Sequence, residues 1–194
     1  LTECETVNQF TGSKTEYNVI GEITGRSIPD DVVVIGGHLD SWDLGTGAID
    51  DGAGVAITMA AGALIGDLKQ APKRTIRVIA FANEEQGLLG GYAYAEAMKA
   101  AVANHQIGAE SDFGAGKIYA LQAGVSATTW PVIEQIGQVL APLGIALDKA
   151  GGGPGPDIGP MAKNGVPWAE LAQDGTDYFD YHHTANDTLD KINA

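Results

Sequence analysis

Five residues of the types that bind divalent metals lie at, or close behind, the ends of apolar segments: His38, Asp50, Glu85, Asp112 and His183. His38 ends the run Val-Val-Val-Ile-Gly-Gly-His, and Glu85 follows a second apolar run that closes with Phe-Ala-Asn-Glu. Imidazole and carboxylate are ligands that zinc and similar metals accept, and one carboxylate can serve two cations about 3.5–4 Å apart. The pattern therefore predicts a two-metal site and a hydrolytic reaction.

Each of these residues also has an ordinary structural interpretation. A histidine at a strand end is often only hydrogen-bonded, and one of the adjacent acids Asp50 and Asp51 can cap the helix that follows them. Glu84 and Glu85 are consecutive acids at the end of an apolar strand. Placing two carboxylates there costs free energy unless positive charge lies nearby. We interpret Asp51 as the helix cap and Asp50 as the ligand, and we expect one glutamate to bind metal while the other moves protons.

Two further residues are candidates for orienting the ligands. Asp40 lies two residues after His38, where it can accept the second ring N–H and fix the nitrogen that faces a metal. Asp187 lies near the pair His182–His183 and can act in the same way. His105 lies in no such pattern, and we interpret it as structural.

A parallel α/β sheet would bring these distant residues together, because the carboxyl ends of its strands share one edge. Apolar runs predict strands over 32–38 and 76–82, while alanine-rich periodic segments predict helices over 52–68 and 88–102. This order favours parallel pairing with helices on both faces, a three-layer α/β/α sandwich. Further predicted elements are a hairpin formed by 5–10 and 16–23, strands over 105–111, 117–123 and 166–171, a helix over 130–143, and a glycine-rich loop over 150–157 that lines the cleft.

Composition limits the class of protein. The chain has 194 residues, enough for one well-packed domain, and a net charge of -14 that disfavours nucleic acid and anionic membranes as partners. Cys4 is the only cysteine, which excludes an internal disulfide and a thiolate metal cage. No stretch approaches the ~20 consecutive apolar residues of a membrane span. The motifs of helix-borne zinc proteases, serine hydrolases and P-loop nucleotidases are also absent from the sequence.

Four motifs in order resemble a known family, and the resemblance runs over nearly the whole chain. They are the segment 37–54 (Gly-His-Leu-Asp to Asp-Asp-Gly-Ala-Gly), Asn-Glu-Glu-Gln-Gly at 83–87, Glu-Ser-Asp at 110–112, and His-His-Thr-Ala-Asn-Asp-Thr at 182–188. The sequence is similar to the co-catalytic zinc aminopeptidases of peptidase family M28, and within them to the carboxypeptidase Q-like subgroup.

The resemblance implies roles for individual residues. One zinc would be bound by His38 and Asp112 and the other by Glu85 and His183, with Asp50 bridging and Glu84 as general base. Three ligand carboxylates and a bridging hydroxide would balance the four charges of two zinc ions, and cobalt or manganese could replace zinc. The likeness also implies a cis peptide between Asp50 and Asp51. His182 takes the place of a tyrosine that steadies the oxyanion in some relatives, so it is a candidate for that role.

The expected activity is hydrolysis of the N-terminal peptide bond of short peptides with a free N-terminus. The resemblance further implies a single catalytic domain over 1–194 without the protease-associated lid of longer relatives, and a secreted or periplasmic location. Two alternatives stay open at this point: a glutaminyl cyclase-like aminoacyl transferase with one zinc, and a non-catalytic binding module on the peptidase fold.

Overall fold

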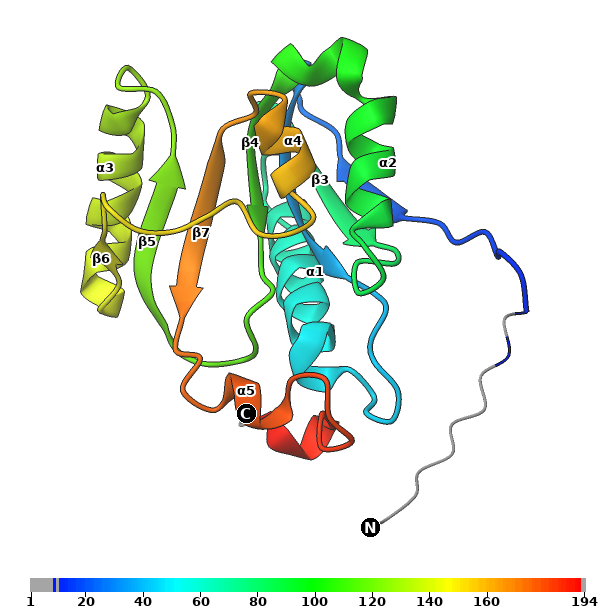
Figure 1. Ribbon diagram of the computed structural model, residues 1–194. Coiled ribbons are helices and arrows are strands. Elements are labelled where there is room, and N and C mark those ends of the chain that lie inside the picture. The colour runs from blue at the N-terminus through cyan, green and yellow to red at the C-terminus, as the bar shows by residue number, and fades with distance from the viewer. Residues whose placement is uncertain (1–8, 10, 193–194) are drawn as a thin grey trace.

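The structure is a computed structural model that describes residues 9 and 11–192. Within this part of the chain, seven strands form one mixed sheet in the order β1-β3-β2-β4-β7-β5-β6. Figure 1 shows the sheet with α3 beside β5 and β6 at one end and α2 toward the other. The strands are β1 (Val19–Ile23), β2 (Ile28–His38), β3 (Arg74–Phe81), β4 (His105–Glu110), β5 (Ile118–Gly124), β6 (Ala146–Leu147) and β7 (Trp168–Gln173).

Helices connect the strands and supply the outer layers. The α-helices are α1 (Ala53–Gly66), α2 (Leu89–Ala97), α3 (Trp130–Leu140), α4 (Gly159–Lys163) and α5 (Tyr178–Tyr181). Shorter turns of helix are η1 (Ala48–Gly52), η2 (Lys99–Asn104), η3 (Ala141–Leu143) and η4 (Leu189–Lys191).

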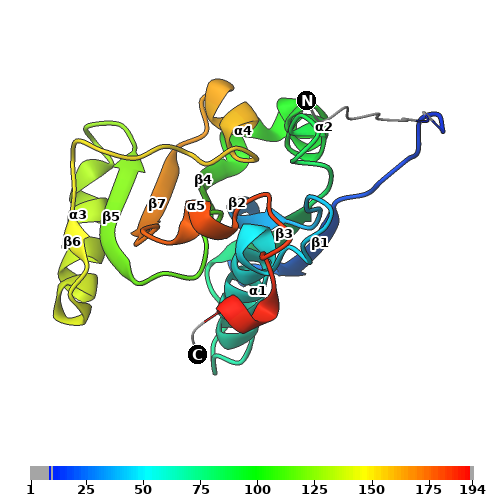
Figure 2. The same cartoon turned by 60° about the horizontal axis from the view of Figure 1, so that its bottom comes forward.

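The centre of the sheet is parallel. Strand β2 pairs in parallel with β3 on one side and with β4 on the other, and β4 pairs in parallel with β7. The carboxyl ends of these four strands therefore meet at one edge, the lower edge in Figure 1, where α5 also lies. Figure 2 brings this edge forward and shows α5 close to the ends of β2 and β7.

The two faces of the sheet are covered by different helices, as a three-layer α/β/α sandwich requires. On one face Val34, Ile79 and Phe81 are fully buried, in a core cluster that α2 and α4 complete with Tyr94 and Met161. On the other face α1 packs on β2 and β3. A second cluster, built around Leu121, Ile133 and Ile145, joins α3 to the β5 end of the sheet.

The structure confirms the expected α/β fold and revises several elements. The first arm of the expected hairpin falls mainly outside the described residues, and its second arm forms β1, which pairs antiparallel with β3. The helix expected over 88–102 ends at Ala97 and continues as η2. Strand β5 runs antiparallel to β7, which the helix-strand alternation did not predict. The elements β6, α4 and α5 were also not predicted.

Two glycines allow α1 to begin directly against the end of β2. A Cβ at Gly37 would overlap the Asp51 carboxylate, and a Cβ at Gly54 would overlap the Ser111 carbonyl oxygen. The absence of side chains at these positions lets the start of α1, the end of β2 and the segment after β4 approach closely. Asp51, just before α1, is therefore within hydrogen-bonding distance of both the end of β2 and the first turn of α1.

One helical stretch, Ala48–Gly66, is long and apolar enough to cross a membrane by length and composition alone. It consists of η1 and α1 and contains the acids Asp50 and Asp51, both buried against the sheet edge. Helix α1 contacts β1, β2 and β3. A core helix passes the same test of length and composition; here 44% of the stretch is buried, and Ile57, Met59 and Leu64 of α1 are exposed.

Candidate metal centre

His38, the last residue of β2, is 1% exposed and its imidazole faces two carboxylates. The Nε2 atom lies 3.0 Å from Asp50 Oδ1 and 3.5 Å from Asp112 Oδ1. The other nitrogen, Nδ1, is 2.9 Å from the backbone carbonyl oxygen of Asp40. An Nδ1–H that donates to this carbonyl leaves Nε2 free to bind a cation together with the two carboxylates.

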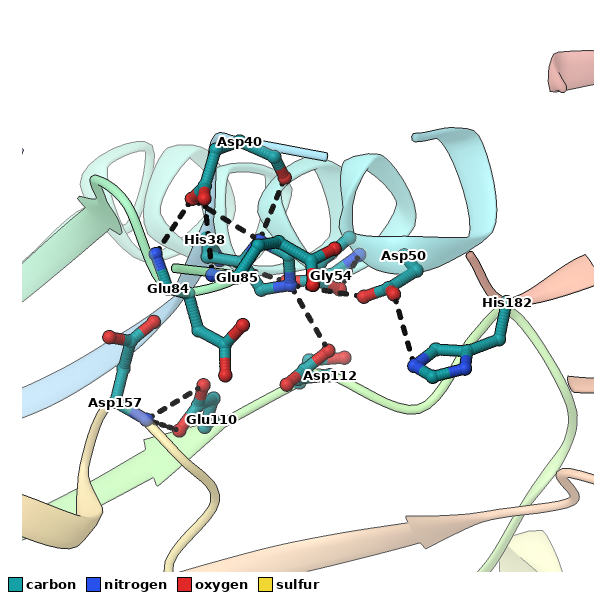
Figure 3. A network of polar contacts seen from close by, with 12 residues as sticks. His38, Asp40, Asp50, Gly54, Glu84, Glu85, Glu110, Asp112, Asp157 and His182 are labelled. Carbon is teal, nitrogen blue, oxygen red and sulfur yellow. Dashed lines mark hydrogen bonds and ion pairs between the residues drawn. The ribbon is translucent and has the colours of Figure 1, made fainter. Parts of the chain in front are cut away.

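Asp50 connects this cluster to a second one. Its Oδ1 atom faces His38, whereas its Oδ2 atom lies 3.4 Å from Nε2 of His182 and 3.4 Å from Nε2 of His183. The side chain is only 5% exposed. The two oxygens of one buried carboxylate thus point to two separate groups of possible metal ligands, as Figure 3 shows for His38 and His182.

The second cluster is completed by Glu85, which follows β3. Its Oε2 atom lies 2.8 Å from His183 Nε2, while its Oε1 atom is buried and has no hydrogen-bond partner among the described residues. Asp112 Oδ1 in the first cluster is also buried and, within the same part of the chain, has no hydrogen-bond partner. Buried carboxylate oxygens normally have partners, so one such atom in each cluster fits a pair of cation sites.

Glu84 lies beside both clusters, and its backbone is held by Asp40. The Asp40 carboxylate accepts hydrogen bonds from the backbone N–H of Glu84 at 2.9 Å and of Glu85 at 3.1 Å. This fixes the direction in which the two glutamate side chains leave the chain. In Figure 3 the Glu84 carboxylate extends toward Asp112, which leaves it close to the ligand groups without an ion pair to them.

Two buried acids hold the backbone around Asp50. Asp51 accepts hydrogen bonds from the backbone N–H of His38 at 3.0 Å and of Gly54 at 3.2 Å, so it ties β2 to the first turn of α1. Asp187 accepts from the N–H of Ile49 at 2.6 Å and of Asp50 at 3.1 Å. The peptide between Asp50 and Asp51 is cis.

The charges at this edge of the sheet are strongly unbalanced. Burial raises the pKa of Asp51 to about 9 and that of Glu84 to about 7, and nearby carboxylates add to both shifts. Burial opposes protonation of His38, but Asp112 and Asp50 raise its pKa to about 12. Such shifts are typical of acids gathered around a site that needs positive charge.

A cleft of about 510 Å³ opens beside Glu84 and is bordered on one side by the two clusters. Other lining residues form an apolar and aromatic wall, with Phe113 stacked on Tyr178 at a centroid distance of 4.6 Å and Phe179 packed edge-on against both. Leu88 and Pro156 also line it. The cleft can therefore hold a group with an apolar side chain directly next to the polar clusters.

The model of peptidase family M28 matches residues 18–194, which is most of the chain. The chain belongs to peptidase family M28. It is 40% identical over 183 residues to carboxypeptidase Q of Pongo abelii and 39% identical to that of Homo sapiens. These matches cover 92% of this chain and 39% of each relative, so the chain spans about two fifths of their length.

Solved structures agree with this assignment. A peptidase M28 precursor from Shewanella amazonensis SB2B superposes with a TM-score of 0.88 at 55% identity, covering 91% of this chain and 40% of the other. The zinc aminopeptidase BSAP from Bacillus subtilis superposes with a TM-score of 0.72 at 23% identity, covering 91% and 45% of the two chains, and supports the fold. The expected similarity to family M28 and to carboxypeptidase Q is confirmed.

The structure of this M28 chain brings together the five residues expected to bind metal, with Glu84 and His182 beside them. Asp40 and Asp187 differ in detail from the expectation. His38 Nδ1 contacts the Asp40 carbonyl oxygen at 2.9 Å, and the Asp40 carboxylate is farther, at 3.6 Å. The Asp187 carboxylate accepts hydrogen bonds from the backbone N–H groups of Ile49 and Asp50. Among the described residues, it bonds to neither histidine ring.

Sequence reasoning missed two residues near the site. Asp157 is fully buried, and within the described chain neither of its carboxylate oxygens has a hydrogen-bond partner. Burial raises its pKa to about 8. Trp42 packs its ring against His183 at a centroid distance of 5.3 Å. The only sequence signals were their positions, Asp157 at the end of the glycine-rich loop and Trp42 between His38 and Asp50.

His105 lies elsewhere, bonded to Tyr94 and the Ala101 carbonyl oxygen, as expected of a structural residue.

Proposed function

We propose that this chain carries the catalytic site of a zinc-dependent exopeptidase, an aminopeptidase or dipeptidase that removes the N-terminal residue of short peptides. One observation carries the proposal most directly: the two oxygens of buried Asp50 face two different groups of ligand atoms. A carboxylate shared in this way suits a two-metal hydrolytic site. Family membership and the names of the zinc aminopeptidase and carboxypeptidase Q relatives support the same class of reaction.

In this proposal His38 and Asp112 would hold one metal, Glu85 and His183 would hold the other, and Asp50 would serve both. Asp112 Oδ1 and Glu85 Oε1, which have no hydrogen-bond partner among the described residues, support the assignment, because each can offer a lone pair to a cation in its own cluster. The ligands are nitrogen and oxygen atoms without any thiolate, a set that accepts zinc and also cobalt or manganese. When bound, two such cations polarise the scissile carbonyl and make water more acidic.

Glu84 is the proposed general base. Its carboxylate borders the cleft and its backbone is fixed by Asp40, so its side chain starts from a defined position. It would take a proton from the attacking water and deliver it to the nitrogen of the leaving amine. A positioned proton carrier of this kind contributes roughly 100-fold to 10,000-fold to the rate.

His182 is the proposed donor to the oxygen that becomes negatively charged during attack. Its Nε2 atom faces the same Asp50 oxygen as His183, and its ring lies on the cleft wall against Tyr178 and Phe179. The carboxylates of the site would hold the free α-amine of the peptide. The aromatic wall formed by Phe113 and Phe179 would contact the side chain of the N-terminal residue.

The activity is tested with paired dipeptide and tripeptide substrates that carry either a free or an acetylated N-terminus. The proposal predicts cleavage of the free peptides and little cleavage of the acetylated ones. Equal cleavage of both series would contradict an exopeptidase that binds the amine. Peptides with apolar and acidic first residues, compared at the same concentration, show whether the aromatic wall contributes to specificity.

The role of Glu84 is tested with Glu84→Gln, which has nearly the same shape and no proton-accepting carboxylate. The variant should keep its metal content and lose at least about 100-fold in kcat. Retained turnover would contradict the role of general base. The same preparations separate the alternative functions, because a glutaminyl cyclase-like transferase would bind one metal and a binding module would show no turnover in the parent chain.

We also propose that the described residues act as a single catalytic domain of a secreted or periplasmic enzyme. The site supports one domain, because its ligands come from segments between β2 and the C-terminal loop that share one sheet. Limited proteolysis that leaves one stable fragment of nearly full length would support it. Fractionation of the source cells tests the location.

A further inference from the structure

We propose that Trp42 is a positioning residue for the Glu85–His183 half of the metal centre, the half that the fold itself supports least. The inference rests on the proposed two-metal function and adds to it a residue with a specific task. Trp42 lies in the loop between β2 and η1, and its ring is 5.3 Å from the His183 ring at an interplanar angle of 42°.

The two histidine ligands are supported very differently. His38 ends a central strand, is 1% exposed, and has its Nδ1 atom at 2.9 Å from a backbone carbonyl oxygen. The His183 side chain is 38% exposed, and among the described residues no hydrogen bond holds its Nδ1 atom. Histidines that bind metals are normally oriented by a hydrogen bond at the second nitrogen. His183 must therefore be oriented by other contacts.

Ring packing provides those contacts. His183 stacks on His182 at a centroid distance of 3.6 Å and an angle of 22°, and it also packs against Trp42. The backbone at His183 has a φ of 59°, in the left-handed region that side chains other than glycine rarely adopt. A residue in this conformation persists where neighbouring groups hold it. Of these two ring contacts, Trp42 is the one that comes from a different part of the chain.

Glu85 is the partner of His183 in this half of the site. Glu85 Oε2 lies 2.8 Å from His183 Nε2. A side chain that orients His183 therefore also affects the contact between His183 and Glu85.

The geometry explains why tryptophan suits this position better than a purely apolar residue. Its ring offers a larger surface for packing on an imidazole than a phenyl or aliphatic side chain does. Its 44% exposure also shows that burial in the core is not its main role. Loss of a residue that orients a metal ligand typically weakens metal binding by about 10- to 100-fold.

The test compares Trp42→Ala, Trp42→Phe and the control Trp130→Phe, which removes an indole on α3 next to Lys149 and away from the site. Metal-free protein of each variant is titrated with zinc in competition with a chelator, so that two binding steps are resolved. Trp42→Ala should weaken one step by about 10- to 100-fold and change the other by less than about 3-fold. Trp42→Phe should fall between Trp42→Ala and the parent chain, and Trp130→Phe should match the parent.

Tryptophan fluorescence provides a second readout that does not depend on catalysis. Zinc should change the emission of the parent chain and of Trp130→Phe, and the change should be largely lost in Trp42→Phe. Circular dichroism of the metal-free variants checks the fold. If Trp42→Ala does not fold, Trp42→Phe decides the question, because it keeps an aromatic ring and removes only the indole N–H and part of the surface.

The outcomes separate this inference from the proposed function. A parent chain that binds fewer than two zinc ions would contradict the two-metal function. A parent chain that binds two, together with Trp42 variants whose two zinc affinities equal those of the parent, would overturn the role of Trp42. Equal weakening of both steps would also overturn it, because the inference assigns Trp42 to one half of the centre.

Discussion

Replacement of Asp187 by asparagine should destabilise the segment that carries Asp50, although residue 187 lies 137 positions away along the chain. The Asp187 carboxylate is 4% exposed and accepts hydrogen bonds from two consecutive backbone N–H groups, those of Ile49 and Asp50. Asparagine has one oxygen and one NH₂ group in the same space. One of the two N–H groups would then face another donor.

The expected loss of stability follows from the energies of these bonds. A hydrogen bond to a charged group contributes about 1.5–3 kcal/mol, and a buried donor left without a partner costs about 1–3 kcal/mol. Ile49 and Asp50 are 5% and 4% exposed, so water cannot easily replace the lost acceptor. We expect Asp187→Asn to lower the free energy of unfolding by about 2–4 kcal/mol. This is a large fraction of the roughly 5–15 kcal/mol that stabilises a typical domain.

The measurement is urea denaturation of metal-free protein, followed by zinc titration of the folded variant. Asp190→Asn is the matched control, because Asp190 lies in the same C-terminal loop with a side chain that is 70% exposed. The control should change stability by less than about 0.5 kcal/mol. Equal stability of the two variants, or unchanged zinc affinity in Asp187→Asn, would show that the Asp187 carboxylate does not hold Asp50 in place.

Three other predictions concern residues that bind no metal in the proposal. Gly37→Ala should cost about 1–3 kcal/mol because its methyl group would overlap the Asp51 carboxylate, whereas Gly21→Ala on β1 meets no atom and is the control in thermal unfolding. Burial lowers the pKa of His105, so the unfolded chain binds the proton more readily than the folded chain does. The free energy of unfolding should therefore fall as the pH drops from about 6.5 toward the lower pKa of the folded state. The His105→Gln variant should show a weaker pH dependence. Phe81→Ala removes a fully buried ring and should lower the unfolding free energy by about 3–5 kcal/mol in urea.

The part of the site that the sequence could predict depends on strand ends. Apolar runs located β2 and β3, and in a parallel sheet their carboxyl ends must share an edge, which places His38 near Glu84 and Glu85. Asp112 follows β4, which pairs with β2, and the same argument applies to it. The resemblance to family M28 then separated ligands from neighbours that local pattern left ambiguous.

The remaining features depend on contacts that no local pattern records. The alternation of side chains along β5 does not depend on the direction in which the strand runs. Its antiparallel pairing with β7 therefore follows only from the complete fold. Strand β6 has two residues and α5 has four, too few to show a period. The bonds of Asp187 to Ile49 and Asp50, and the packing of Trp42 on His183, join segments whose positions are set by the whole sheet.

The most direct test of a shared carboxylate between two metal sites is a zinc count on the dialysed chain and on two variants. The parent chain should bind two zinc ions per molecule, His183→Ala should retain one, and Asp50→Ala should lose high-affinity binding at both sites. A parent chain with one ion or none, or an Asp50→Ala variant that retains as much zinc as His183→Ala, would contradict the account.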